Sequence, residues 1–185
     1  MNKKFIALMK KRAGNGSVGP STAWGMGPPG TIKAAKKFLH NFNLKSVNAR
    51  NEASFLKKLD KATEKLRRSL PCGGRYWGSS RKFLNIFLRN CLYNRYLCDY
   101  YRLGHLEAWL EVPLDSHVAK GLKFPNEGRD LPRWKTVIGL TPEVSSKFQE
   151  VATRVAKRRK VARIHLDNLY WRGGHMAKKA GKRKA

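Results

Sequence analysis

Two short stretches of the sequence carry side chains that could do chemistry. In residues 110 to 124 (LEVPLDSHVAKGLKF), Asp115 follows a proline and precedes an amphipathic run, where it is expected to cap a helix by accepting backbone hydrogen bonds. Residues 70 to 82 (LPCGGRYWGSSRK) form a glycine- and serine-rich turn that ends in Lys82. The helix start and Arg81 place that amine in a positive field, which disfavours the ammonium form and favours nucleophilic attack. The aspartate could stabilise positive charge that develops on a substrate sugar.

The glycine-rich turn also has the features of a phosphate-binding segment. Backbone N–H groups at a helix N-terminus bind phosphate, and glycines let the backbone approach it closely. Tyr76 and Trp77 lie in this turn, where they could wedge into a duplex, stack on an extruded base or pack against the helix start. The residues expected to contact DNA are Gly73, Gly74, Arg75, Gly78, Ser79, Ser80, Arg81, His117 and Lys120.

Helices are expected to position these residues, because apolar side chains recur at helical spacing and no stretch alternates with period two. The predicted helices cover about 31–39, 52–69, 80–103, 116–124 and 161–172, with a further one starting at 141–142. The helix over 80–103 is apolar around most of its circumference, which predicts a central, buried position. Ser79 or Ser80 is expected to cap it and Gly104 to end it. The sequence therefore predicts an all-α class, a compact helical bundle.

Composition predicts three parts. Residues 1–30 form a basic, Gly/Pro-rich N-terminal arm that is irregular from 13 onward, residues 31–174 a helical domain, and residues 175–185 a basic tail that is disordered in isolation. The apolar run near the N-terminus (FIALM) is too short for a secretory signal, and no run is long enough to span a bilayer. These features favour an intracellular protein, in the cytoplasm or nucleoid, or in the nucleus of a eukaryote.

The charge of the chain points to a polyanionic partner. Lys and Arg number 40 against 12 Asp and Glu, a formal net charge of +28. Nucleic acid is the partner that such a field favours, because each neutralised phosphate releases counterions. An anionic membrane is disfavoured, since no basic amphipathic anchor is evident. The three cysteines form no CxxC pair, so they indicate neither a zinc site nor a disulfide framework. The protein is expected to be a monomer.

The two stretches together resemble a known family. GSSRKFLNIFL followed by VPLDSHVAKGL is similar to the paired signature of the helix-hairpin-helix base-excision DNA glycosylases, whose turn L-P-G-x-G-x-K enters one helix and whose segment V-P-V-D-[ST]-H-V-x-R opens another. The second segment is matched in register by Val112, Pro113, Asp115, Ser116, His117 and Val118. The first is matched loosely by Leu70, Pro71, Gly73, Gly78 and Lys82. The likeness covers roughly residues 66 to 124.

The resemblance implies a helix-hairpin-helix element and an enzyme. Asp115 takes the place of the family's catalytic aspartate, and Lys82 that of the lysine that attacks C1′ in members with abasic-site lyase activity. The implied substrate is a modified base in double-stranded DNA, an oxidised purine first of all, extruded from the duplex. No metal or organic cofactor is needed. Lys82 and Asp115 are 33 residues apart, a separation longer than is usual in the family, although an archaeal 8-oxoguanine glycosylase group also has long separations. A longer central helix and the insertion RLGHLEAWLE would absorb the excess.

Less specific interpretations stay open beside this one. Asp115 can be a plain helix cap, and Lys82 one of many solvated lysines. Glu107 and Glu111 are expected on solvated surface or paired with arginine. The alternative function is a non-enzymatic, strongly basic DNA- or RNA-binding protein, including a ribosome-associated component. A metal-dependent nuclease has no support, because the acids are scattered along the chain.

Overall fold

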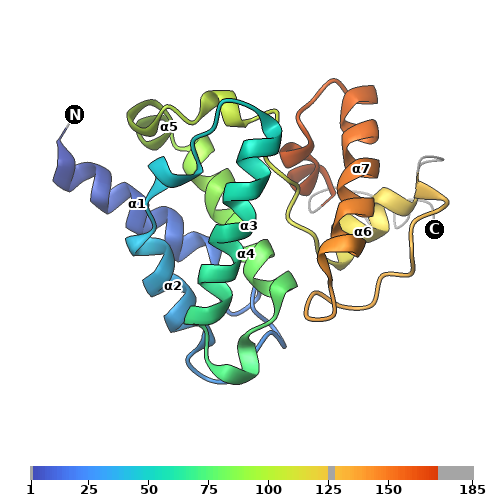
Figure 1. The fold of residues 1–185 in the computed structure, drawn as a ribbon, viewed down its shortest axis with the longest axis horizontal. Coiled ribbons are helices and arrows are strands. Elements are labelled where there is room, and N and C mark those ends of the chain that lie inside the picture. Colours follow the sequence, from blue (N-terminus) through green and yellow to red (C-terminus); the bar gives the residue numbers. More distant parts are fainter. Residues whose placement is uncertain (1, 125–127, 171–185) are drawn as a thin grey trace, which may run out of the picture. The chain divides into compact units, whose positions relative to one another are not determined.

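The computed structural model describes residues 2–124 and 128–170. Every regular element in these ranges is a helix, which confirms the predicted all-α class (Figure 1). The elements are α1 (Lys3–Ser17), α2 (Thr31–Asn41), η1 (Leu44–Val47), α3 (Glu52–Ser69), η2 (Cys72–Gly74), α4 (Trp77–Tyr93), α5 (Arg95–Tyr101), η3 (Gly104–Leu106), α6 (Ser116–Lys123), α7 (Pro142–Arg158) and η5 (Arg163–His165). Among the described residues, no helix is both long and apolar enough to cross a membrane.

The chain folds as two compact units, Met1–Leu110 and Glu111–Ala185. This division differs from the predicted one, because residues 1–30 belong to the first unit together with α2 to α5. The predicted tail, 175–185, and the end of the predicted helix 161–172 lie outside the described residues.

Helix α4 is the centre of the first unit. It packs against α1, α2, α3 and α5, and it runs beside α3 in Figure 1. Phe83, Phe87 and Cys91 of α4 have no exposed surface. The prediction that this apolar segment is the central, buried helix is confirmed, since a helix that is apolar all round must be covered on every side.

The predicted ends of this helix are wrong. Helix α4 begins at Trp77, before both serines, and the Ser80 hydroxyl donates to the Tyr76 carbonyl within the first turn (3.0 Å). It stops at Asn94, well before Gly104, and α5 follows directly. The Asn94 side chain accepts a hydrogen bond from the Leu97 N–H (3.1 Å). Because this local bond satisfies the first turn of a new helix, it competes with continuation of the old one.

The N-terminal segment is also more ordered than predicted. Residues 13–17 continue α1 as a helix, in which Ile6 and Met9 are buried. Gly14 lies inside this helix although glycine has a low helix propensity. A Cβ at this position would lie 2.8 Å from the His40 ring of α2, so a larger residue would not fit. The glycine therefore allows α1 and α2 to approach closely, and packing outweighs propensity.

In the second unit, α6 packs against α7 and α7 against η5. Helix α7 begins as predicted, with Thr141 accepting from the Val144 N–H (3.3 Å) and proline in the first turn. The core of this unit is formed mainly by apolar side chains of α6, α7 and η5, including Val118, Leu122, Phe148, Val155 and Ile164.

Candidate functional site

Asp115 lies at the N-terminus of α6, and the predicted cap is confirmed. Its Oδ1 accepts hydrogen bonds from the backbone N–H groups of His117 and Val118, each at 3.0 Å. The residue is only 8% exposed. Two donors on one carboxylate oxygen fix the position of this acid and join it to the positive end of the helix dipole.

The segment that leads into Asp115 is held by a side chain of α7. The Gln149 amide accepts from the Val112 N–H (3.1 Å) and donates from Nε2 to the Val112 carbonyl (2.8 Å). Val112, Pro113 and Leu114 are all buried. The V-P-x-D frame is therefore anchored on one side by Gln149 and on the other by the cap, so Asp115 has little freedom to move.

Glu111 opens the same segment and is buried (6% exposed), which overturns the solvated-surface alternative, whereas pairing with an arginine stays a prediction. Residues 107–111 are not part of a regular helix. Side chains four residues apart are neighbours only on a helix, so Glu107 and Glu111 are not expected to lie side by side here.

Lys82 lies in the second turn of α4 and is 8% exposed. A lysine buried to this degree is uncommon, which makes a plain solvated role a poor description of it. Lys82 belongs to the first unit and Asp115 to the second.

Arg81 was expected to contact phosphate, and its observed contacts are internal. The guanidinium is ion-paired with Asp60 (2.9 Å), donates to the Thr63 hydroxyl (2.9 Å) and lies 5.3 Å from the centre of the Trp77 ring. Arg81 is 5% exposed. These contacts hold α3 and α4 together. The contact with Arg81 agrees with a packing role for Trp77, and the wedge role stays a prediction.

The glycines and serines of the turn are also used for packing more than expected. A Cβ on Gly74 would lie 2.9 Å from the Thr31 hydroxyl, so this glycine is needed where the turn meets the start of α2. Gly78, Ser79 and Ser80 lie in the first turn of α4 and are buried. Of the residues predicted to contact DNA in the turn, Gly73 and Arg75 are exposed, and the candidate wedge Tyr76 is 37% exposed.

The remaining predicted contacts, His117 and Lys120, are exposed on α6. Lys120 lines a pocket of about 350 Å³, and Ser116, which follows Asp115 in the sequence, lines it too. The pocket is lined by Ser116, Ala119, Lys120, Lys123, Phe124, Arg133 and Trp134. Three of these side chains are cationic and none is acidic, so the pocket suits an anionic group such as a phosphate.

Arg133 and Trp134 were not predicted as site residues. Trp134 packs edge-on against Phe148 of α7 (centroids 5.5 Å apart), which fixes the loop beside α6. The signal in the sequence is an Arg–Trp pair within a loop, but only the fold places that loop next to Lys120 and Lys123.

No family model, curated protein or solved structure matches the chain. Among the described residues there is also no group of three or more His, Cys, Asp or Glu that could hold a metal ion. The function therefore rests on the residues and geometry given above.

Proposed function

We propose that the protein is a DNA N-glycosylase that excises a modified base from double-stranded DNA. The observation that carries this proposal is the buried Asp115 carboxylate, fixed at the start of α6 by two backbone donors. An oxidised purine is the proposed substrate class, which rests on the sequence resemblance alone. The predicted helix-hairpin-helix element corresponds to α3, η2 and α4 and stays a prediction.

Asp115 has the properties that the chemistry needs. Capping alone does not require an acid, since serine, asparagine and threonine serve as well. A fixed carboxylate in a water-poor site stabilises positive charge more strongly than a solvated one does. We assign it to the stabilisation of the oxocarbenium-like sugar that forms as the base departs, and to activation of the nucleophile.

Lys82 is the proposed nucleophile. Its amine would bond to C1′ as the bond between C1′ and the base breaks and the electron pair leaves with the base. The product is an aminal, whose C1′–O4′ bond then breaks as O4′ takes up the proton lost by the amine. The ring-opened Schiff base permits β-elimination, in which a proton leaves C2′ and the 3′ phosphate departs, and this nicks the strand. The proposed step needs no metal or organic cofactor.

The pocket that follows Asp115 supports DNA binding near the reacting sugar. Lys120, Lys123 and Arg133 can hold a phosphate of the strand that carries the damaged base. Such contacts position the backbone without reading its sequence, which suits an enzyme whose specificity lies in the extruded base.

A panel of lesions tests the proposal. Duplexes that carry 8-oxoguanine, uracil or an abasic site are incubated with the full chain, with and without borohydride. Release of a base from at least one duplex, and a covalent protein–DNA adduct after reduction, are expected. Absence of both across the panel, with duplex binding intact, would reject the enzyme.

A non-enzymatic nucleic-acid-binding protein is the second candidate. The observation that favours it is the row of cationic side chains along α3, where Lys61 and Lys65 are exposed. Binding of undamaged and damaged duplexes with equal affinity, without base release, is the result that this candidate predicts.

A further inference from the structure

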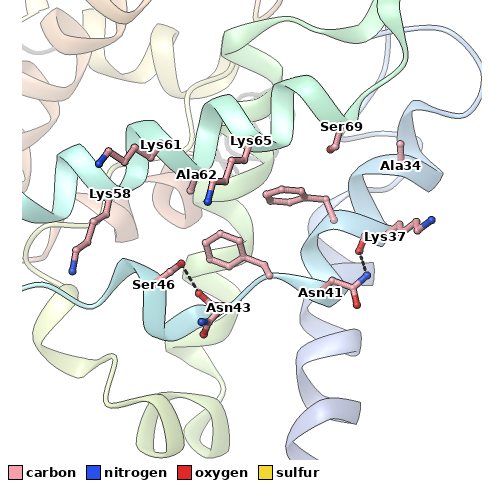
Figure 2. Close-up of a pocket in the computed structure, with 12 residues that line it drawn as sticks. Ala34, Lys37, Asn41, Asn43, Ser46, Lys58, Lys61, Ala62, Lys65 and Ser69 are labelled. Carbon is pink, nitrogen blue, oxygen red and sulfur yellow. Dashed lines mark hydrogen bonds between the residues drawn. The ribbon is translucent and has the colours of Figure 1, made fainter.

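The first unit contains a groove that the proposed chemistry does not use. It has a volume of about 830 Å³ and lies between α2, η1 and α3 (Figure 2). The groove is lined by Ala34, Lys37, Phe38, Asn41, Phe42, Asn43, Ser46, Lys58, Lys61, Ala62, Lys65 and Ser69. Its size falls in the range of roughly 300–1,000 Å³ typical of pockets for small organic ligands.

The charge of this lysine groove is of one sign. Lys58, Lys61 and Lys65 follow one face of α3 at i, i+3 and i+7, and Figure 2 shows them projecting from that helix. Lys37 adds a fourth cation from α2, and none of the lining residues is acidic. An anion is therefore the ligand that the groove favours.

The three acids of α3, Glu52, Asp60 and Glu64, do not line the groove. Asp60 is ion-paired with Arg81 (2.9 Å), and Glu64 with Arg67 (2.9 Å). The acids of α3 thus lie away from the lysines that line the groove.

Two phenylalanines give the groove an aromatic wall. The rings of Phe38 and Phe42 are 5.8 Å apart, and Phe42 also packs edge-on against Phe87 of α4 (6.1 Å). Phe42 is buried (8% exposed), whereas Phe38 is half-buried and keeps part of its ring accessible. A ring held in this way can stack on a flat ligand without having to be ordered first.

We propose that this groove binds a single strand of nucleic acid, with phosphates on the lysines and one base stacked on Phe38. Proteins that bind single strands combine a cationic groove, which contacts the phosphates, with aromatic side chains, on which the bases stack. In a duplex the faces of the bases are covered by their neighbours, so the aromatic wall distinguishes an unpaired strand from a paired one. The inference goes beyond base excision and does not depend on it.

The length of the groove agrees with this ligand. Lys58 and Lys65 are seven residues apart on α3, which corresponds to about 10 Å at 1.5 Å per residue. That distance spans about three nucleotide steps at 3.4 Å per nucleotide along a stacked strand. Asn41, Asn43 and Ser46 line the groove on the side of α2 and η1, where their polar groups can contact the sugars or the base edges.

Binding of short labelled strands tests the proposal. The probes are an oligo-dT 12-mer, an oligo-rU 12-mer and an undamaged DNA duplex of the same length. The groove variant is Lys61→Gln with Lys65→Gln. Its matched control is Lys33→Gln with Lys57→Gln, two exposed lysines of α2 and α3 that do not line the groove but remove the same charge.

The groove variant is expected to bind single strands about tenfold more weakly than the wild type. Its slope of log K against log salt should fall by about 1.4, which is 0.7 for each of two lost contacts. The control should change affinity by less than about twofold. The comparison of oligo-dT with oligo-rU decides whether DNA or RNA is the preferred strand. Equal losses in the two double variants would overturn the proposal, because they would show that only total charge matters.

Phe38→Leu tests the aromatic wall separately while it keeps an apolar side chain on α2. We expect single-strand affinity to fall at least about fivefold, with duplex affinity unchanged. A strand with 5-iodouracil should photocrosslink to the peptide that contains Phe38 in the wild type. An unchanged affinity in Phe38→Leu, or an equal loss for the duplex, would reject a single-strand site.

The same titrations in Asp115→Asn separate this inference from the proposed enzyme. Asparagine keeps the helix cap, so the fold should persist. Unchanged single-strand binding in this variant supports the groove whether or not any base is released. Loss of single-strand binding in Asp115→Asn would place the strand on the second unit and overturn the groove assignment.

Discussion

Helices α3 and α4 are consecutive and both basic, but they carry their cations in opposite ways. Helix α3 places Lys61 and Lys65 in the open, along the lysine groove. Helix α4 buries Arg81 and Lys82 to 5% and 8% exposure. In a chain with a net charge of +28, the number of cations therefore says little about what each one does. Burial separates those that are accessible to an outside anion from those that are enclosed by the fold.

The physical basis of this difference is desolvation. An exposed lysine keeps its hydration and loses it only in part when a phosphate approaches. A buried cation needs partners within the protein, and Arg81 has them in Asp60, Thr63 and Trp77. The solvated lysines of α3 are therefore suited to reversible binding, and the buried cations of α4 to fixed positions.

Removing one lysine from each helix tests most strongly whether the buried and the exposed lysines have different roles. Lys82→Gln is expected to abolish the borohydride-trapped adduct on a lesion-containing duplex, because no other amine would be placed at C1′. Lys61→Gln, the matched change on α3, should leave the adduct yield within about threefold of the wild type. The measurement is adduct yield on denaturing gels at saturating protein. Equal adduct yields from the two variants would show that burial does not mark the reacting lysine.

The second test concerns the neighbouring cation, Arg81. Arg81→Met keeps much of the volume but removes the charge-assisted hydrogen bonds, so the free energy of unfolding should fall by about 2 kcal/mol. Asp60→Asn should cost less than about 1 kcal/mol, because the Asp60 side chain is 61% exposed. Urea unfolding followed by circular dichroism gives both values. A loss below about 0.5 kcal/mol in Arg81→Met would contradict its assignment as an anchor between α3 and α4.

The smallest expected effect comes from His40 of α2. Burial, followed by Lys11 and Lys36, lowers the pKa of His40 below its ordinary value of 6.5. The unfolded chain therefore binds this proton at a higher pH than the native protein does. Stability should accordingly fall as the pH drops below about 6.5, until the native histidine is itself protonated.

His40→Gln should flatten the dependence of unfolding free energy on pH between about 5 and 7. Urea midpoints measured across this range in both proteins provide the check. The same slope in the variant and the wild type would show that other groups cause the dependence.

The sequence predicted the class and several elements well, because apolar periodicity is a local signal. The stretch from Glu52 to Ser69 and the cap at Asp115 appear as expected. The ends of α4 were misplaced, since Asn94 competes through a local hydrogen bond that periodicity does not reveal. The helical residues 13–17 were missed because their helix is stabilised by packing against α2 rather than by propensity.

The site was predictable only in part, for a similar reason. Asp115 was identified because its neighbours in the sequence are also its structural frame. The contacts of Arg81 depend on Asp60 and Thr63, about twenty residues away on another helix. The lysine groove joins α3 to Lys37 and Phe38 of α2, and no spacing within one segment indicates such a meeting.

Single-turnover base release by Asp115→Asn tests the central claim most directly. Asparagine caps helices as well as aspartate does, so the thermal midpoint and duplex affinity should stay close to those of the wild type. On the lesion duplex that the wild type processes, the rate of base release should fall at least about 100-fold, because the carboxylate is lost while the fold is kept. Base release at the wild-type rate by a folded Asp115→Asn variant would show that Asp115 is only a helix cap and would contradict its assignment as the catalytic carboxylate.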